Sequence, residues 1–575
     1  MSNIKQATIL LLFISSFLMH CLAMCPNSIR LPCICRSTRY EPISITCDRV
    51  TDIYLTCQSL GAMNILIDSL TISNSPIDRL PARAFAGYRI KRLILRNNNM
   101  TDIDQDAFNG LPITTLRELE IRNNLLTSVP QAGISKLQRL STFVLANNNI
   151  RILPAASFAI YQSRSWITKL DLSANGMERI DDDAFLGLDS VRELNLGKNN
   201  LVYVPTEALQ RLLALEDLSL AANQISSVPV HSLNFPQLKS ISLEVNKIAS
   251  IEANAFAGIP SLLYLYISSN RFEELDQSML RSVPRLKVLA MGNNPIRYLS
   301  VGSFRFVQEL VRLEMPDCAL RSIEQGTFQT IPKVQVIVLS RNQLRRITRH
   351  MFQGLGELYS LDLKGNKAEE VDDRAFALLP SLRHLDLSDN LISTLPRNTF
   401  DGTFQAGSNR VLYLYENPWN CDPMLDWLRQ WLRDRREIVI DAPGNPPTVC
   451  KGPGPLLGWP IRTINPELPI IPGPESGALK PVTESIAHNK ARMHLAAMIL
   501  GIILGIFLIT LLLLLVVRYF ASQKRRNDKE AMEDQRRLGS TMTGSVFPSP
   551  AVPMSTIHSR RNYNYNLSRP WYWWF

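Results

Sequence analysis

The residue types that carry out catalysis or hold metals are present in this chain, but their spacing does not suit either task. The seven histidines occur singly. We find no His-Glu-x-x-His pair to hold zinc, no Gly-x-Ser-x-Gly turn to expose a nucleophile and no Gly-x-x-x-x-Gly-Lys loop to bind phosphates. The sequence therefore predicts a protein that is not an enzyme and that uses no metal and no cofactor.

Cysteine is the reactive residue type whose positions are informative. Four cysteines lie close together at residues 25, 33, 35 and 47, and another two lie at 421 and 450. Such clusters at both ends of a repeat array predict disulfide-bonded caps made in an oxidising compartment.

Two further cysteines, Cys57 and Cys318, are separated by about ten copies of a sequence repeat. If each copy adds one strand to a stack, at about 4.8 Å per strand, the two cysteines lie roughly 50 Å apart. A disulfide needs Cα atoms within about 7 Å, so we do not expect these two to pair. For Cys318 we favour a buried, inert thiol over a redox role. The sequence does not decide whether Cys57 is free or exchanges with the front cap.

Between the two clusters, the pattern L-x-x-L-x-L-x-x-N-x-L recurs fifteen times, for example over residues 385–392. The asparagine position of the pattern falls at Ser75, Asn98, Asn124, Asn148, Asn175, Asn199, Asn223, Asn246, Asn270, Asn294, Cys318, Asn342, Asn366, Asn390 and Asn417. A motif with this period predicts a leucine-rich-repeat solenoid. We expect an α/β-type horseshoe of short strands and convex loops, in which the asparagines form a ladder of amides and Ala-Phe pairs fill the convex side.

The front cluster, Cys25-x7-Cys33-x-Cys35-x11-Cys47, and the segment Asn417-Pro-Trp419-Asn-Cys421-Asp resemble the flanks of the extracellular leucine-rich-repeat family. This is the typical 24-residue class found in Toll-type receptors, Slit, capricious and tartan. The resemblance implies the pairs Cys25–Cys35 and Cys33–Cys47. The chain departs from the family at Pro423, where a further cysteine is usual, and its late partner is missing too. Cys421–Cys450 is the bridge that remains at this end, and we expect this cap to hold but to be looser.

Two apolar runs predict the topology. Residues 1–23 resemble a secretory signal with cleavage after Ala23. Residues 495–517 form an apolar, uncharged run that is long enough for a transmembrane helix. The basic residues that follow this run predict a single-pass type I protein of the plasma membrane with its N-terminus outside. The net charge is +11, and much of the excess lies in the tail, so we expect no nucleic-acid partner.

These features predict seven segments of the chain. They are a signal peptide (1–23), an N-terminal cap (24–60), the leucine-rich repeats (61–416), a C-terminal cap (417–451), a proline-rich stalk (452–494), the transmembrane helix (495–517) and a disordered cytoplasmic tail (518–575).

The two C-terminal segments carry motifs for partners. Ala497, Gly501 and Gly505 are spaced by four, which favours close helix packing and a lateral homodimer. Trp573 and Phe575 end the chain like a PDZ-domain ligand and predict a cytoplasmic adaptor. An aromatic contact with the lipid headgroups is the alternative for these two residues.

The concave face is the default binding surface of a solenoid. Four neighbouring strands in the middle of the array place aromatic, small apolar and charged residues on it. The candidate ligand-binding residues are Tyr264, Tyr266, Val288, Ala290, Arg312, Glu314, Val336 and Val338. Apolar patches with polar rims mark interfaces, and tyrosine is frequent in binding hot spots. The alternative is that these tyrosines are there as good strand formers.

Asn99-Met-Thr101 is a glycosylation sequon on the turn after the second ladder position. If a glycan is attached at Asn99, that edge is not expected to be buried against a partner.

Together these features predict a cell-surface receptor or adhesion protein that binds a protein ligand on its concave face and recruits an adaptor through its tail. A structural protein that organises matrix, and a co-receptor that presents ligand to a signalling partner, remain open. So does the choice between homophilic and heterophilic binding.

Overall fold

The computed structural model describes residues 25–26, 29, 31–53, 56, 65–112, 114–135, 137, 139–159, 166–404, 410–441 and 444–463. All of them belong to one compact unit that ends at Pro469. The expected signal peptide, Cys57, most of the stalk, residues 495–517 with Ala497, Gly501 and Gly505, and the tail with Trp573 and Phe575 lie outside the described residues. Within the described ranges, no helix has the length and apolar character needed to cross a membrane.

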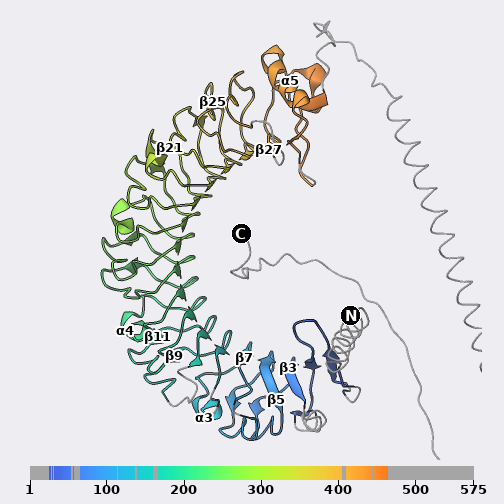
Figure 1. The fold of residues 1–575 in the computed structure, drawn as a ribbon, viewed down its shortest axis with the longest axis vertical. Helices are drawn as coiled ribbons and strands as arrows, with labels where there is room; N and C mark the ends of the chain where they lie inside the picture. Colours follow the sequence, from blue (N-terminus) through green and yellow to red (C-terminus); the bar gives the residue numbers. More distant parts are fainter. Residues whose placement is uncertain are drawn as a thin grey trace, which may run out of the picture. The chain divides into compact units, whose positions relative to one another are not determined.

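The repeats form an arc whose inner side is lined by one sheet of 18 strands (Figure 1). The first two strands pair antiparallel, and every later strand pairs parallel with that of the next repeat. In the order of pairing, the strands are β1 (Cys33–Arg36), β2 (Ser44–Asp48), β3 (Leu66–Ser73), β5 (Arg89–Arg96), β7 (Glu118–Arg122), β8 (Thr142–Val144), β10 (Lys169–Asp171), β12 (Glu193–Asn195), β13 (Asp217–Ser219), β15 (Ser240–Ser242), β17 (Tyr264–Tyr266), β18 (Val288–Ala290), β20 (Arg312–Glu314), β22 (Val336–Val338), β24 (Ser360–Asp362), β26 (His384–Asp386), β27 (Arg410–Tyr413) and β28 (Ile438–Val439).

Short elements complete each repeat away from this sheet. Five two-stranded parallel pairs follow the asparagine turns, and single helical turns occur in some repeats. The paired strands are β4 (Arg79–Leu80) with β6 (Asp102–Ile103), β9 (Ile152–Leu153) with β11 (Arg179–Ile180), β14 (Ser227–Val228) with β16 (Ser250–Ile251), β19 (Tyr298–Leu299) with β21 (Ser322–Ile323), and β23 (Arg346–Ile347) with β25 (Glu370–Val371). The helical turns are α3 (Gln131–Ile134), α4 (Thr206–Leu209), η2 (Gln277–Leu280) and η3 (Thr327–Thr330).

Each strand alternates between the core and the inner surface of the arc, as the sequence predicts. In β17, Leu265 is fully buried while Tyr264 and Tyr266 beside it are partly exposed. We define the concave face as the first and third residues of each repeat strand together with the residue two places after it. Burying a leucine contributes about 1.5–3 kcal/mol, and this burial requires the neighbouring repeats, so the stack stabilises itself repeat by repeat.

The predicted asparagine ladder is present, and Asn199 shows how it works. Its Nδ2 donates to Leu172 O at 3.2 Å and to Leu196 O at 2.9 Å. Its Oδ1 accepts from Asn175 N at 2.9 Å and from Met177 N at 3.0 Å. One buried amide thereby bonds backbone groups of its own repeat and of the preceding one, and it supplies the acceptor that the buried N–H groups of Asn175 and Met177 need away from water.

A second stack runs through the convex side. Phe304, Phe328, Phe352, Phe376 and Phe400 lie face to face, with neighbouring ring centroids 6.0–6.5 Å apart and interplanar angles of 7–17°. The last of these rings lies 5.2 Å from that of Trp431 in the C-terminal cap. The stack therefore continues from the repeats into the cap.

The N-terminal cap closes one end of the core with β1 and β2. Disulfides link Cys25 to Cys35 and Cys33 to Cys47, the pairs that the family resemblance implies. Arg92 of the second repeat joins this cap to the third, because its guanidinium lies 2.7 Å from Glu41 and 2.5 Å from Glu118.

The C-terminal cap contains η4 (Pro423–Leu425), α5 (Asp426–Asp434), η5 (Gly454–Leu456) and η6 (Ile461–Thr463). Cys421 is bonded to Cys450, and the buried Trp419 donates its indole N–H to Leu414 O at 2.7 Å.

This cap extends beyond the boundary we drew at residue 451. Residues 452–463, which we expected to begin the stalk, pack on it instead, since Ile461 is fully buried and its N–H bonds to Thr448 O at 3.1 Å. The several prolines in this segment indicated an extended chain, but they are compatible with short 3-10 turns, of which η6 is anchored to the cap by Ile461.

Candidate functional site

Four adjacent strands bring the eight predicted ligand-binding residues together. Pairing of β17, β18, β20 and β22 aligns Tyr264, Val288, Arg312 and Val336 in one row. The same register aligns Tyr266, Ala290, Glu314 and Val338 in a second row two residues further along each strand. We call these two rows the concave patch. Because the strands are parallel and in register, positions predicted from sequence spacing become direct neighbours in space.

The residues of the concave patch differ in what they present to a ligand. Both tyrosines, Val288 and Val338 are partly exposed. Ala290 and Val336 are only 3% and 8% exposed, so these two support the patch from below rather than offer contact area. Ala290 is small and stands between the larger Tyr266 and Glu314 of the neighbouring strands, which explains its burial.

Charge is balanced within one strand of the patch. Arg312 donates from Nε to Glu314 in a short contact, and both side chains remain about one third to two fifths exposed. Burial, reinforced by the negative charge of Glu314 and Glu244, raises the pKa of Tyr266 to about 12. Its hydroxyl therefore stays protonated at neutral pH.

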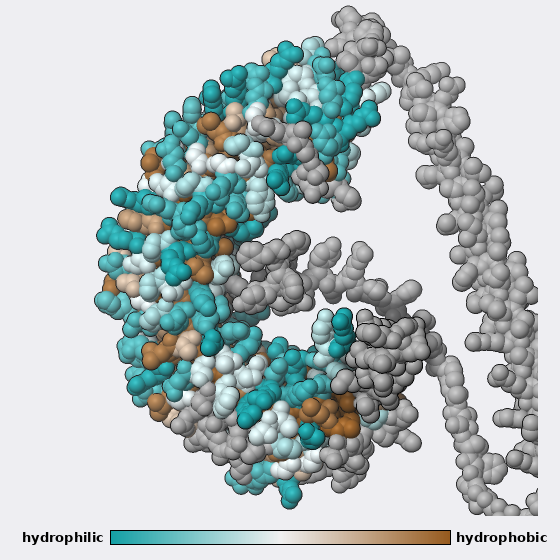
Figure 2. All heavy atoms as spheres, viewed as in Figure 1, coloured by the Kyte–Doolittle hydropathy of each residue, from teal (hydrophilic) through white to brown (hydrophobic). Residues whose placement is uncertain are grey.

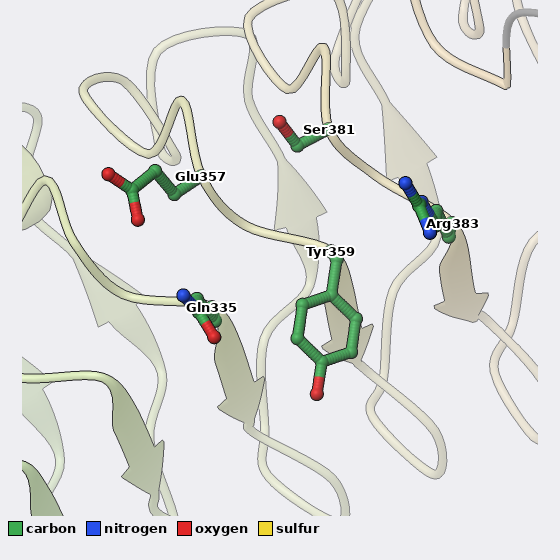
Figure 3. Close-up of a pocket in the computed structure, with 5 residues that line it drawn as sticks. All are labelled: Gln335, Glu357, Tyr359, Ser381 and Arg383. Atoms are coloured by element: carbon green, nitrogen blue, oxygen red, sulfur yellow. The ribbon is translucent and has the colours of Figure 1, made fainter. Parts of the chain in front are cut away.

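The structure also places a hollow of about 440 Å³ that we did not predict, lined by Gln335, Glu357, Tyr359, Ser381 and Arg383 (Figure 3). Three of these residues come directly before β22, β24 and β26, so the hollow lies on the flank next to the concave face. Tyr359 is 44% exposed. An aromatic residue at the position before a strand, where most repeats carry a polar or charged one, is the signal that sequence reading missed.

Away from these sites, hydrophobic residues are mostly spread among hydrophilic ones on the side of the arc that Figure 2 shows. The sequon residue Asn99 is exposed on its turn. Next to it runs an exposed ladder that the sequence analysis missed. In this ladder, Asn97 donates to Asn74 at 3.0 Å and accepts from Asn123 at 2.8 Å.

Cys318 occupies its ladder position as a free, fully buried thiol. Burial raises the pKa of this thiol to about 11, so it stays protonated and unreactive at neutral pH. The thiol donates to Met291 O at 3.3 Å, as a ladder amide would. The N–H of Ile296 does not use it as an acceptor and bonds to Asn294 O at 2.8 Å within its own turn.

Comparison with known proteins agrees with this architecture. A leucine-rich-repeat family model matches residues 114–160, 166–225, 214–272, 308–367 and 356–403. Tsukushi-A of Xenopus laevis is 28% identical over 176 residues, which is 31% of this chain and 49% of that protein. Human leucine-rich repeats and immunoglobulin-like domains protein 1 is 26% identical over 238 residues, which is 41% of this chain and 16% of that protein.

The matched repeats and these relatives support an extracellular leucine-rich-repeat family for this chain. The chain spans about half the length of the Tsukushi proteins that it matches. Two solved structures share the fold of this chain at 20% sequence identity. The TLR13–ssRNA13 complex aligns with a TM-score of 0.61 over 73% of this chain and 64% of that one, and mouse RP105/MD-1 aligns at 0.58 over 73% and 66%.

Proposed function

We propose that this protein is a cell-surface recognition receptor or adhesion protein that binds a protein ligand through the concave patch. The observation that carries this proposal is the register that sets Tyr264 and Tyr266 beside Val288 and Ala290, with the Arg312–Glu314 pair on the next strand. Two half-buried aromatic rings beside apolar side chains, with charged groups at the rim, have the composition of a protein-binding hot spot.

The relatives support a binding role of this kind. Mouse RP105 was solved with MD-1, and TLR13 with RNA, so proteins of this fold serve as recognition surfaces for other macromolecules. The chemistry of the present patch favours protein over RNA, since its one arginine is already paired with a carboxylate.

The test is a binding assay with clustered ectodomain, residues 24–490, on cells that display the full-length protein and then on a library of other surface proteins. We compare the wild type with Tyr264→Asp/Tyr266→Asp. The matched control is Tyr203→Asp/Tyr298→Asp, which changes two tyrosines that are 56% and 53% exposed and lie off the concave face.

We expect the concave pair of substitutions to abolish binding and the control pair to preserve it. Binding to the displayed protein itself would make the contact homophilic, and binding to another protein would make it heterophilic. The proposal fails if the Tyr264→Asp/Tyr266→Asp ectodomain is folded and still binds every partner that the wild type binds.

The remaining parts of the proposal concern the membrane. We propose a single-pass type I protein held by residues 495–517, which pairs laterally through Ala497, Gly501 and Gly505 and recruits an adaptor through Trp573 and Phe575. Deleting residues 518–575 separates the alternatives. A signalling receptor loses its function, whereas an adhesion molecule or a co-receptor that presents ligand keeps it. Deleting Phe575 alone abolishes a PDZ contact and barely affects a lipid contact.

A further inference from the structure

We infer that the protein segment received by the concave patch is positively charged. This inference rests on the proposed function, because it names the partner's chemistry at the same site. The concave face around the patch carries the opposite charge to the chain as a whole, whose net charge is +11.

From β10 to β26, the concave face holds three cations and seven carboxylates. The cations are Lys169, Arg312 and Lys364, and the carboxylates are Asp171, Glu193, Asp217, Glu244, Glu314, Asp362 and Asp386. A surface with this excess of negative charge attracts basic partners and repels acidic ones, and it increases the rate at which a basic partner associates.

Most of these carboxylates have no cation of their own. Glu193 is paired with Lys169 at 2.7 Å, and Glu314 is paired with Arg312. Throughout the part of the chain that the structure describes, the other five form no ion pair. Their hydrogen bonds come from neutral donors, such as the N–H and hydroxyl groups of Ser388, which both donate to Asp386.

Two of the unpaired carboxylates lie within two strands of the tyrosines. Asp217 stands two strands from Tyr264 in the same row, separated by Ser240. Glu244 follows β15 and lies close enough to Tyr266 to influence its titration. Burial raises the pKa of both carboxyls, with serine hydrogen bonds opposing the shift. A cation from a partner would reduce the cost of burying these carboxylates, and at Glu244 the nearby Tyr266 ring offers the same cation a cation–π contact.

The test uses the full-length chain, solubilised in detergent and captured on a surface, with a displayed library of random peptides as the probe. Clones bound by the wild type are measured against Tyr264→Ala/Tyr266→Ala and against the isosteric neutral variant Asp217→Asn/Glu244→Gln. Asparagine and glutamine preserve the serine hydrogen bonds, so the second variant is expected to fold. The control, Asp182→Asn/Glu207→Gln, neutralises two exposed carboxylates on the outer side of the arc.

We expect the clones that need the tyrosines to be rich in lysine and arginine. Their affinity should fall about tenfold on Asp217→Asn/Glu244→Gln and stay within twofold on the control, with a larger loss at low salt. Clones that need the tyrosines but are neutral or acidic, or that ignore the two neutral substitutions, overturn the charge inference and leave the proposed function standing. Clones that need the carboxylates but not the tyrosines overturn the proposed function alone. If no clone depends on either pair, both are wrong.

Discussion

Replacing Asn199 with alanine should destabilise the solenoid strongly, because one buried amide serves two repeats. Asn199 is 3% exposed, and its Oδ1 accepts from Asn175 N and Met177 N. After the substitution, these two donors remain buried without their partner, whereas the carbonyls of Leu172 and Leu196 keep the side-chain amides of Asn175 and Asn223. A buried donor left unsatisfied costs about 1–3 kcal/mol. We therefore expect the free energy of unfolding to fall by about 3–5 kcal/mol for the two unsatisfied donors.

Replacing Cys318 with alanine should reduce the free energy of unfolding far less, although Cys318 occupies the equivalent position in its repeat. The thiol donates weakly to two carbonyls, Met291 O at 3.3 Å and Pro316 O at 3.5 Å. The neighbouring donor, Ile296 N, already has a partner within its own turn at 2.8 Å. Cys318→Ala thus leaves no comparable N–H group without an acceptor. It should reduce the free energy of unfolding by about 1 kcal/mol, mainly because of the small cavity that it creates.

Thermal unfolding of the two variants measures this difference, and hydrogen exchange followed by mass spectrometry locates it. For Asn199→Ala we expect faster exchange in peptides that contain Asn175 and Met177, with distant repeats unchanged, because each repeat contacts only its neighbours. An equal loss of thermal stability in Asn199→Ala and Cys318→Ala would refute the reasoning. So would a loss for Asn199→Ala without faster exchange at the preceding turn.

Three further predictions concern packing, the front cap and pH. Gly292→Ala should lower the melting temperature, because the new Cβ would lie 2.6 Å from Pro316 Cδ and 2.9 Å from Pro316 O. Adding Pro316→Ala removes the ring but not the carbonyl, so it should restore part of the lost melting temperature, and an unchanged loss would contradict this cause. Arg92→Ala removes both ion pairs that join the cap to the third repeat and should cost about 1 kcal/mol, detected as faster proteolysis within the cap at an unchanged rate elsewhere. Hydrogen bonds from Lys287 and Lys333 lower the pKa of Glu309 from its ordinary 4.5 to about 2. The contribution of Glu309 to stability is therefore present above pH 4.5 and is lost as the pH falls through about 2. An NMR titration of this carboxyl with a midpoint near 4.5 would show that the two lysine contacts do not form in solution.

The repeats were predictable because their period is written directly in the sequence. Leucine, asparagine and phenylalanine recur at fixed intervals, and parallel stacking in register converts each interval into a column of contacts. This is why the asparagine ladder, the concave position of Tyr264 and the convex stack through Phe352 follow from spacing alone.

Features that depend on irregular contacts were not predictable from spacing. Ala290 belongs to the predicted rows, yet it is buried because of the sizes of the side chains on the two neighbouring strands. Residues 452–463 fold onto the C-terminal cap through the buried Ile461, although their prolines indicated an extended chain. The hollow beside Tyr359 combines five residues from three successive repeats, so a reading of single strands does not reveal it.

Hydroxyl-radical footprinting tests the central claim most directly. The full-length chain is labelled with and without the protein partner that the binding assay captures, and side-chain oxidation is compared along the solenoid. We predict protection of Tyr264, Tyr266 and Val338, while the exposed Tyr203 and Tyr298 are oxidised as in the free protein. Unchanged oxidation of the concave tyrosines, with protection confined to the outer side of the arc or to Tyr359 on the flank, would contradict binding through the concave patch.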